Sequence, residues 1–231
     1  MPVFQVKHNK KIVEGKFDST KPSLADWQVH MRIVKAKKPK SFFPGDVPVK
    51  IVKEFSPELA KPVTMIFSMI TNTGEYPRQW VIEHQLSIPK VIPPQSEEDL
   101  RNISSTAFLS KVYESFVGQW LFPYVEPHLD PGQCGGLKGS SITHYLVKLL
   151  DFVHTYMDKR DPFAVLLVLV DLEKAFNRVS HFWVIQDLAD MHVPGWLLQI
   201  LISYLTDRSM FMRYSQTKST KGIISVRQGR R

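Results

Sequence analysis

Hydrophobic residues recur along this chain at two kinds of spacing, and each kind predicts a different element. Apolar side chains three and four positions apart predict amphipathic helices at 49–71, 109–121, 142–157, 184–191 and 195–206. The first of these helices should break near Pro57 or Pro62, because proline removes a backbone donor and crowds the preceding turn. The helical pattern therefore accounts for much of the chain.

Patterns typical of strands are shorter. Residues 164–170 read Ala-Val-Leu-Leu-Val-Leu-Val, a continuous apolar run that is typical of a strand buried on both faces. Short β-prone or alternating runs predict further strands at 81–88, 210–214 and 222–226. Together these patterns predict a helix-rich α+β fold with a short sheet.

Composition excludes several classes of protein. With 43% hydrophobic and 23% charged residues in 231, the chain can form a globular core, so disorder throughout is excluded. A single cysteine, Cys134, excludes a disulfide scaffold and fits a reducing, intracellular compartment, without separating nucleus from cytoplasm. The longest apolar run is far below the ~20 residues that a membrane helix needs, so we expect no membrane partner.

The positive charge is concentrated near the amino terminus. Residues 1–61 hold 13 Lys and Arg against 6 Asp and Glu, a net of +7 out of the total of +8. The first 48 residues read as a basic, irregular arm with a lysine cluster at 35–40. Such an arm favours phosphate backbones through counterion release, and a solvated basic tail is an equally good interpretation of charge alone.

Candidate chemistry begins at Asp171, which directly follows the predicted buried strand. A carboxylate at the end of a strand is a common ligand for a divalent cation. Five residues later, Phe176 can place an aromatic ring beside the same site. The alternative is that Asp171 only caps the next helix and that Phe176 belongs to the core.

Several segments in a fixed order resemble one family. The segment Asp-Leu-Glu-Lys-Ala-Phe-Asn-Arg-Val, which starts at Asp171, resembles motif A of the reverse transcriptases of non-LTR retrotransposons. Further segments resemble the fingers motif, the two landmarks after it, and the helix and turn that follow motif A, at 88–104, 110–114, 129–140 and 194–208. Asn102 stands where the fingers motif usually has proline. The resemblance covers about residues 62–229.

The resemblance implies a right-hand polymerase fold reduced to fingers and a partial palm. Residues 1–48 would be the basic arm, 49–160 a fingers-like helical region, and 161–231 the partial palm with motif A and a degenerate motif B. The implied activity is RNA-templated DNA synthesis by two-metal nucleotidyl transfer, with an RNA template, a DNA primer and deoxynucleoside triphosphates as partners.

The resemblance also assigns roles to single residues. Asp171 would be the catalytic carboxylate, binding Mg²⁺ together with the carbonyl of Leu172, and Phe176 would exclude a 2′-hydroxyl from the incoming nucleotide.

Lys90 and Arg101 would hold the triphosphate, and Lys138 and Gly139 would lie against the template. Without the resemblance, Lys90 reads as a solvated charge and Arg101 as the partner of a neighbouring acid. The glycine-rich run around Gly139 then reads as a turn that caps a helix.

Near the carboxyl end, Gln228 and Gly229 resemble the nucleotide-contacting pair of motif B, but Ser225, Arg227 and Arg230 depart from that motif. The departures matter because a long cation is a poor substitute where backbone passes close to a nucleotide.

No Asp-Asp pair occurs in the 231 residues, so the carboxylates of motif C are absent, as is the thumb. We therefore expect that the chain does not polymerise alone. Either the fragment folds marginally, or a partner or downstream polypeptide completes the palm beside residues 164–170. The alternatives are a non-catalytic module that binds RNA or an RNA-DNA hybrid, and an inert retroelement remnant.

Overall fold

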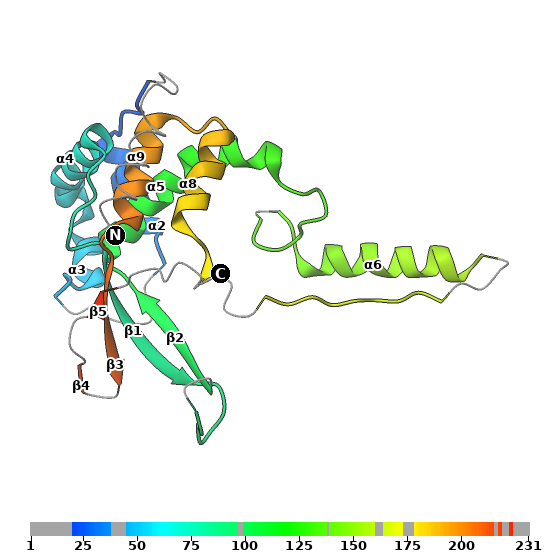
Figure 1. Ribbon diagram of the computed structural model, residues 1–231. Coiled ribbons are helices and arrows are strands. Elements are labelled where there is room, and N and C mark those ends of the chain that lie inside the picture. Colours follow the sequence, from blue (N-terminus) through cyan, green and yellow to red (C-terminus); the bar gives the residue numbers. More distant parts are fainter. Residues whose placement is uncertain are drawn as a thin grey trace.

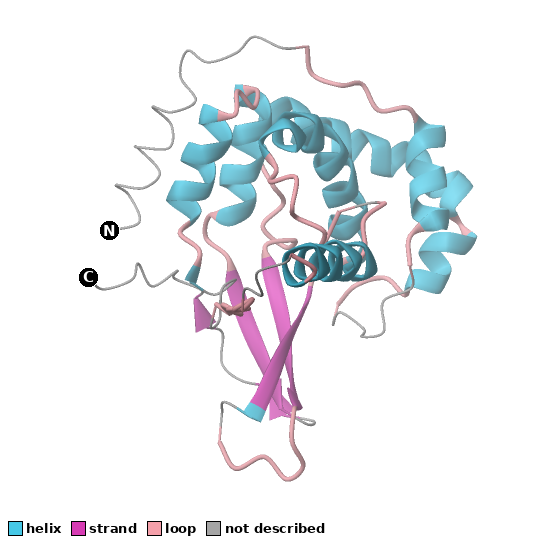
Figure 2. Cartoon of the chain, turned by 90° about the vertical axis from the view of Figure 1, so that its right-hand side faces the viewer, coloured by secondary structure: helices cyan, strands magenta, loops and turns pink. Residues whose placement is uncertain are grey.

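The computed structural model describes residues 20–37, 45–96, 99–137, 139–159, 164–172, 178–214, 217–218 and 222–223. The helices are α2 (Asp26–Lys35), α3 (Val49–Glu54), α4 (Ser56–Thr73), α5 (Phe108–Val125), the 3₁₀ turn η2 (Glu126–His128), α6 (Ile142–Met157), α8 (His181–Asp190) and α9 (Gly195–Leu205). The strands are β1 (Ile82–Pro89), β2 (Leu100–Ser105), β3 (Ser209–Tyr214), β4 (Thr217–Lys218) and β5 (Gly222–Ile223). The fold is α+β and helix-rich, with a small sheet that leaves one end of the helical body (Figures 1 and 2).

The core is built where α2, α4, α5 and α9 meet. Phe67 of α4 is fully buried, and its ring contacts Tyr113 and Phe116 of α5 at centroid distances of 5.0 and 6.1 Å. Leu197 and Leu198 of α9 are equally buried in the same cluster. The three- and four-residue spacing of these side chains gives each helix one apolar face, so packing the faces together removes them from water.

The first predicted helix divides as its prolines indicate. The break falls at Phe55, between α3 and α4, so Pro57 lies in the first turn of α4, where a missing backbone N–H costs nothing. Pro62 is accommodated inside α4. The helix ends at Gly74, whose φ of 71° is left-handed and whose N–H donates to the Ile70 carbonyl at 2.8 Å.

The arm that the sequence predicts to be irregular contains a packed helix, so this prediction is wrong for residues 26–35. Val29 and Ile33, one turn apart on α2, are fully buried against the core. Lys53 of α3 donates its Nζ to the carbonyl of Val34 at 2.8 Å and to that of Ala36, which satisfies the end of α2. The helix therefore depends on contacts distant in sequence more than on its own propensity.

The sheet has the strand order β2-β1-β3-β4, with β5 pairing to β3. β1 and β2 form an antiparallel hairpin in which Ile88 pairs with Arg101, whereas β1 and β3 are parallel, with Ile82 opposite Ser209. The predicted strands at 81–88 and 210–214 are confirmed, and β2 was not expected. Its sequence, Leu-Arg-Asn-Ile-Ser-Ser, lacks a clear alternation of apolar and polar residues.

The predicted buried strand at 164–170 is not formed. This segment has no strand assignment, and Leu166 and Leu169 are 87% and 86% exposed. Figure 1 shows α6 leading away from the helical body and residues 164–172 leading back toward it. A strand exists only where a neighbour completes its backbone hydrogen bonds, and no described strand lies beside this one. Within the described part of the chain, no helix is long and apolar enough to span a membrane.

Candidate functional site

The β1–β2 hairpin brings together the two cations that the sequence assigns to triphosphate binding. Arg101 of β2 lies opposite Ile88, and the backbone N–H of Lys90 donates to the Asp99 carbonyl at 2.7 Å. Residues that pair across an antiparallel ladder share a face, and so do residues two apart on one strand. Lys90 and Arg101 therefore lie on the same face of the hairpin, and both are exposed.

Asp99 shapes the tip of this hairpin. Its carboxylate accepts hydrogen bonds from the backbone N–H groups of Gln95 and Ser96 at 2.9 and 3.0 Å, and from the Ser96 hydroxyl at 3.3 Å. The two backbone hydrogen bonds are the main reason that the pKa of Asp99 is lowered, and the charge of Lys90 lowers it further. Asp99 thus stays ionised and holds the loop in place.

The alternative, that Arg101 pairs with a neighbouring acid, is tested only for Asp99, because Glu97 and Glu98 lie outside the described residues. No described carboxylate forms an ion pair with the Arg101 guanidinium, and Asp99 is engaged by the loop. By the same rule the ionised Asp99, which stands opposite Lys90, shares this face, so the face carries two cations and one carboxylate. Arg101 is the cation there whose planar guanidinium can engage two phosphate oxygens at once.

Asp171 and Leu172 lie apart from this pair. Both are exposed on the segment that returns beside α6, which extends to the right of the helical body in Figure 1, whereas the β1–β2 hairpin extends below that body. No hydrogen bond or ion pair within the described ranges reaches the Asp171 carboxylate. The structure therefore brings Lys90 and Arg101 together, but does not bring Asp171 to them.

The described residues do not fit a magnesium site at Asp171. Mg²⁺ takes six oxygens in octahedral geometry, and here one carboxylate and the carbonyl of Leu172 are on offer. No group of three or more His, Cys, Asp and Glu side chains gathers anywhere in the described ranges. We derive no step through a metal from these residues.

Of the two residues that the resemblance assigns to the template, Gly139 is within the described residues. It precedes α6 and has a left-handed φ of 83°. Two residues later, Ser141 caps α6, its hydroxyl accepting from the N–H of His144 at 3.4 Å. The loop thus serves as a helix-capping turn, with room around Gly139 for a closely approaching backbone. Lys138, Phe176, Gln228 and Gly229 lie outside the described residues.

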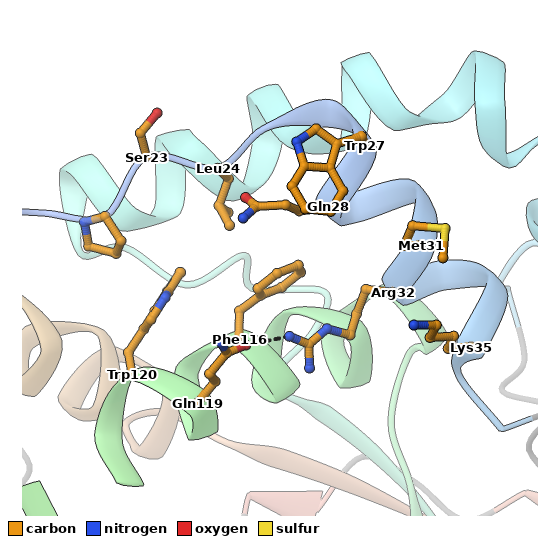
Figure 3. Close-up of a pocket in the computed structure, with 11 residues that line it drawn as sticks. Ser23, Leu24, Trp27, Gln28, Met31, Arg32, Lys35, Phe116, Gln119 and Trp120 are labelled. Carbon is orange, nitrogen blue, oxygen red and sulfur yellow. Dashed lines mark hydrogen bonds between the residues drawn. The ribbon is translucent and has the colours of Figure 1, made fainter. Parts of the chain in front are cut away.

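A groove that the sequence did not indicate lies between α2 and α5 (Figure 3). It has a volume of about 610 Å³, and its lining includes Trp27, Met31, Arg32, Lys35 and Trp120. Trp27 is 67% exposed and Lys35 is also exposed, so an aromatic face and a cation are both accessible.

Arg32 is fixed in this groove. Its guanidinium lies 4.4 Å from the ring centroid of Phe116 and donates to Gln119 Oε1 at 2.5 Å. The only sequence signal for this surface was the one-turn spacing of Trp27 and Met31 next to basic residues, within a segment that we expected to be irregular.

A polar network joins the helical body to the sheet. The Tyr76 hydroxyl lies 3.0 Å from Ser110 Oγ, which donates to Glu114 Oε1 at 2.7 Å. Burial raises the pKa of Tyr76, and the charge of Glu114 raises it further, so Tyr76 stays protonated. The centroids of the Tyr76 and Tyr204 rings lie 5.1 Å apart, and the Tyr204 ring packs against the guanidinium of Arg208, the residue just before β3. Tyr76, Ser110 and Arg208 are buried and hydrogen-bonded, so this network holds the fold together.

Comparison with known proteins adds no relative. No protein-family model matches the sequence, and no curated protein matches it either. The interpretation of the site therefore depends on the chain's own residues and their arrangement.

Proposed function

We propose that this chain is a fragment of a retroelement reverse transcriptase, comprising the fingers and the start of the palm. The family activity is RNA-templated DNA synthesis, and the chain by itself holds only part of that machinery. The order of the sequence segments from 88–104 to 194–208 supports this proposal. Each segment is weak alone, but their succession along the chain is specific.

One structural observation carries the proposal beyond the sequence. The β1–β2 hairpin carries the exposed side chains of Lys90 and Arg101, with the Asp99 carboxylate opposite Lys90, and the nearness of these two cations in the ladder supports a triphosphate site. A planar guanidinium can engage two phosphate oxygens at once, and the neighbouring ammonium adds a point charge. We propose that these two residues bind the triphosphate of an incoming deoxynucleotide.

Catalysis is a different matter for the chain alone. No group of three or more His, Cys, Asp and Glu side chains gathers among the described residues, and two-metal nucleotidyl transfer needs carboxylates that converge on both ions. We therefore propose that the chain binds nucleotide but does not extend a primer without further polypeptide.

Equilibrium binding of dTTP to the whole chain tests the proposal. We expect the Lys90→Gln/Arg101→Gln double variant to lose about tenfold to hundredfold in affinity, because two charge-assisted contacts are removed. Lys61→Gln, a change at an exposed lysine of α4, is the matched control and should bind as the unchanged chain does. Equal affinity of all three proteins would contradict the proposed role of the hairpin.

A second candidate function, RNA binding without catalysis, is favoured by the α2–α5 groove. Exposed Trp27 offers a face on which a base can stack, and Lys35 lies within reach of a phosphate in the same groove. Single-stranded nucleic acid is bound by this combination of aromatic platforms and cations.

The two candidates are separated by different variants. RNA binding through the groove should weaken about tenfold in Trp27→Ala/Lys35→Gln and remain unchanged in Lys90→Gln/Arg101→Gln. Filter binding of a labelled oligoribonucleotide measures this, with Lys61→Gln again as the control. If neither double variant affects any ligand, an inert remnant is the better interpretation.

A further inference from the structure

α6 and residues 164–172 form an apolar arm, which is distinct from the basic arm of residues 1–48. This apolar arm exposes an unusual amount of apolar surface. None of the sixteen residues of α6 is buried, and Ile142 at its start is 72% exposed. On the returning segment, Val170 is 83% exposed, close to the values of Leu166 and Leu169. Fourteen large apolar side chains of the apolar arm are exposed.

This surface is large enough for a stable interface. At roughly 100 Å² each, fourteen such side chains present on the order of 1,000 Å², against the roughly 800 Å² that each partner buries in a standard interface. Monomeric proteins rarely leave apolar patches of more than a few hundred Å² in water. The apolar arm is therefore expected to be covered.

We propose that a second copy of this chain covers the apolar arm, through antiparallel pairing of residues 164–170 with the same residues of the other copy. This run contains no charged residue, no glycine and no proline, and no described strand occupies its backbone donors and acceptors. An identical run satisfies the groups on one edge of the strand without burying a charge.

Asp171 determines the direction of the pairing. In an antiparallel pair centred on Leu167, the Asp171 residues of the two copies stand at opposite ends of the ribbon, about 26 Å apart along the strands. In a parallel pair they would be neighbours at about 5 Å, and like charges directly opposite each other destabilise a sheet. The antiparallel pair also has the twofold symmetry of a closed dimer.

α6 provides the packing layer that a two-stranded ribbon needs. A two-stranded ribbon alone is only marginally stable in water and needs a layer packed on one of its faces. Ile142, Tyr145, Leu149, Phe152 and Tyr156 repeat along α6 at three- and four-residue steps, which forms one apolar stripe. The α6 helices of the two copies cover the ribbon with these stripes.

The mass of the whole chain in solution, from light scattering or sedimentation over a range of micromolar concentrations, tests the proposal. We expect twice the chain mass of 26.6 kDa for the unchanged protein. Leu169→Lys should be monomeric and retain its helical circular dichroism, because Leu169 is exposed within each copy. Ile92→Lys alters a side chain that is 84% exposed between β1 and β2, and this control should remain dimeric.

Cross-linking tests the direction of pairing in the same protein with Cys134→Ser. Leu167→Cys should form a disulfide between copies, because it faces its own counterpart at the centre of the ribbon. Val170→Cys should form none, because an antiparallel partner places it near residue 164. A monomeric unchanged chain, which would leave the apolar arm to a different polypeptide, would overturn the proposal. So would a dimer that persists in Leu169→Lys, open-ended aggregation, or equal cross-linking of Val170→Cys.

Discussion

Arg208 and Glu83 join the beginning of β3 to β1 through a buried ion pair. The Nε of Arg208 donates to Glu83 Oε1 at 3.0 Å, and Nη2 donates to the same oxygen. Arg208 Nη1 also donates to the Tyr204 carbonyl at 3.0 Å, and the guanidinium lies 4.4 Å from the centroid of the Tyr204 ring. One side chain thus connects the sheet to the end of α9.

Breaking this pair should destabilise the protein strongly. Glu83→Gln leaves the buried guanidinium without its counter-charge, and we expect a loss of about 3 kcal/mol in the free energy of unfolding. Urea unfolding measures this. The Glu83→Gln/Arg208→Met double variant should recover part of the loss, because it leaves no unpaired buried charge. A Glu83→Gln loss well below 1 kcal/mol would show that the pair does not hold the sheet to the body.

Acid should weaken the fold through His181. Burial lowers the pKa of His181, the charge of Arg208 lowers it further, and a hydrogen bond to the Leu205 carbonyl opposes both. Below its ordinary value of 6.5 the unfolded chain takes up a proton that the folded His181 does not, so stability falls as the pH falls through 6.5 toward the folded pKa.

We expect the melting temperature to fall as the pH is lowered from about 7 to about 5, and thermal unfolding at a series of pH values measures this change. His181→Gln should flatten the dependence, because the group that takes up the proton is gone. The matched change His128→Gln, at an exposed histidine in η2, should leave the slope as it is. An unchanged slope in His181→Gln would remove His181 from the explanation.

Gly74 and Gly45 allow backbone strain and steric contact to be separated. Both have left-handed φ values, 71° and 88°, but a Cβ at Gly74 would lie 2.6 Å from Cγ of Gln199, whereas nothing lies within 4 Å at Gly45. Gly45→Ala should cost about 1 kcal/mol from conformation alone. Gly74→Ala should cost more, since the Gln199 side chain must move away from its contact with the Thr73 carbonyl. Chemical denaturation measures the free energy of unfolding of both variants. Equal losses would mean that the Gln199 side chain moves away from Gly74 at no cost.

The sequence predicted the elements whose stabilisation is mainly local. The helix at 142–157 has the bounds of α6, because its apolar stripe and the Ser141 cap lie within the segment itself. α2 was missed because Val29 and Ile33 are stabilised by α4 and α5, far along the chain. The run at 164–170 has the composition of a strand but lacks the neighbour that would make it one.

Some residues of the candidate site were singled out by the sequence, and others were not. The resemblance singled out Lys90 and Arg101, and the structure places both on the β1–β2 hairpin, while their role in binding a triphosphate stays a prediction. The groove between α2 and α5 could not be predicted, because Trp27 and Trp120, which both line it, are distant from each other in the sequence. Asp171 was expected at the end of a buried strand, and it is exposed because residues 164–170 pair with no described strand.

The most direct test of the central claim is to map where a deoxynucleoside triphosphate contacts the chain. A photoreactive dTTP analogue, cross-linked to the whole protein and located by peptide mass spectrometry, should label the hairpin between β1 and β2, near Lys90 and Arg101. The label should be displaced by excess dTTP and lost in Lys90→Gln/Arg101→Gln, while Lys61→Gln keeps it. Labelling that remains in the double variant, or that falls on the α2–α5 groove instead, would contradict the assignment of the hairpin as the triphosphate site.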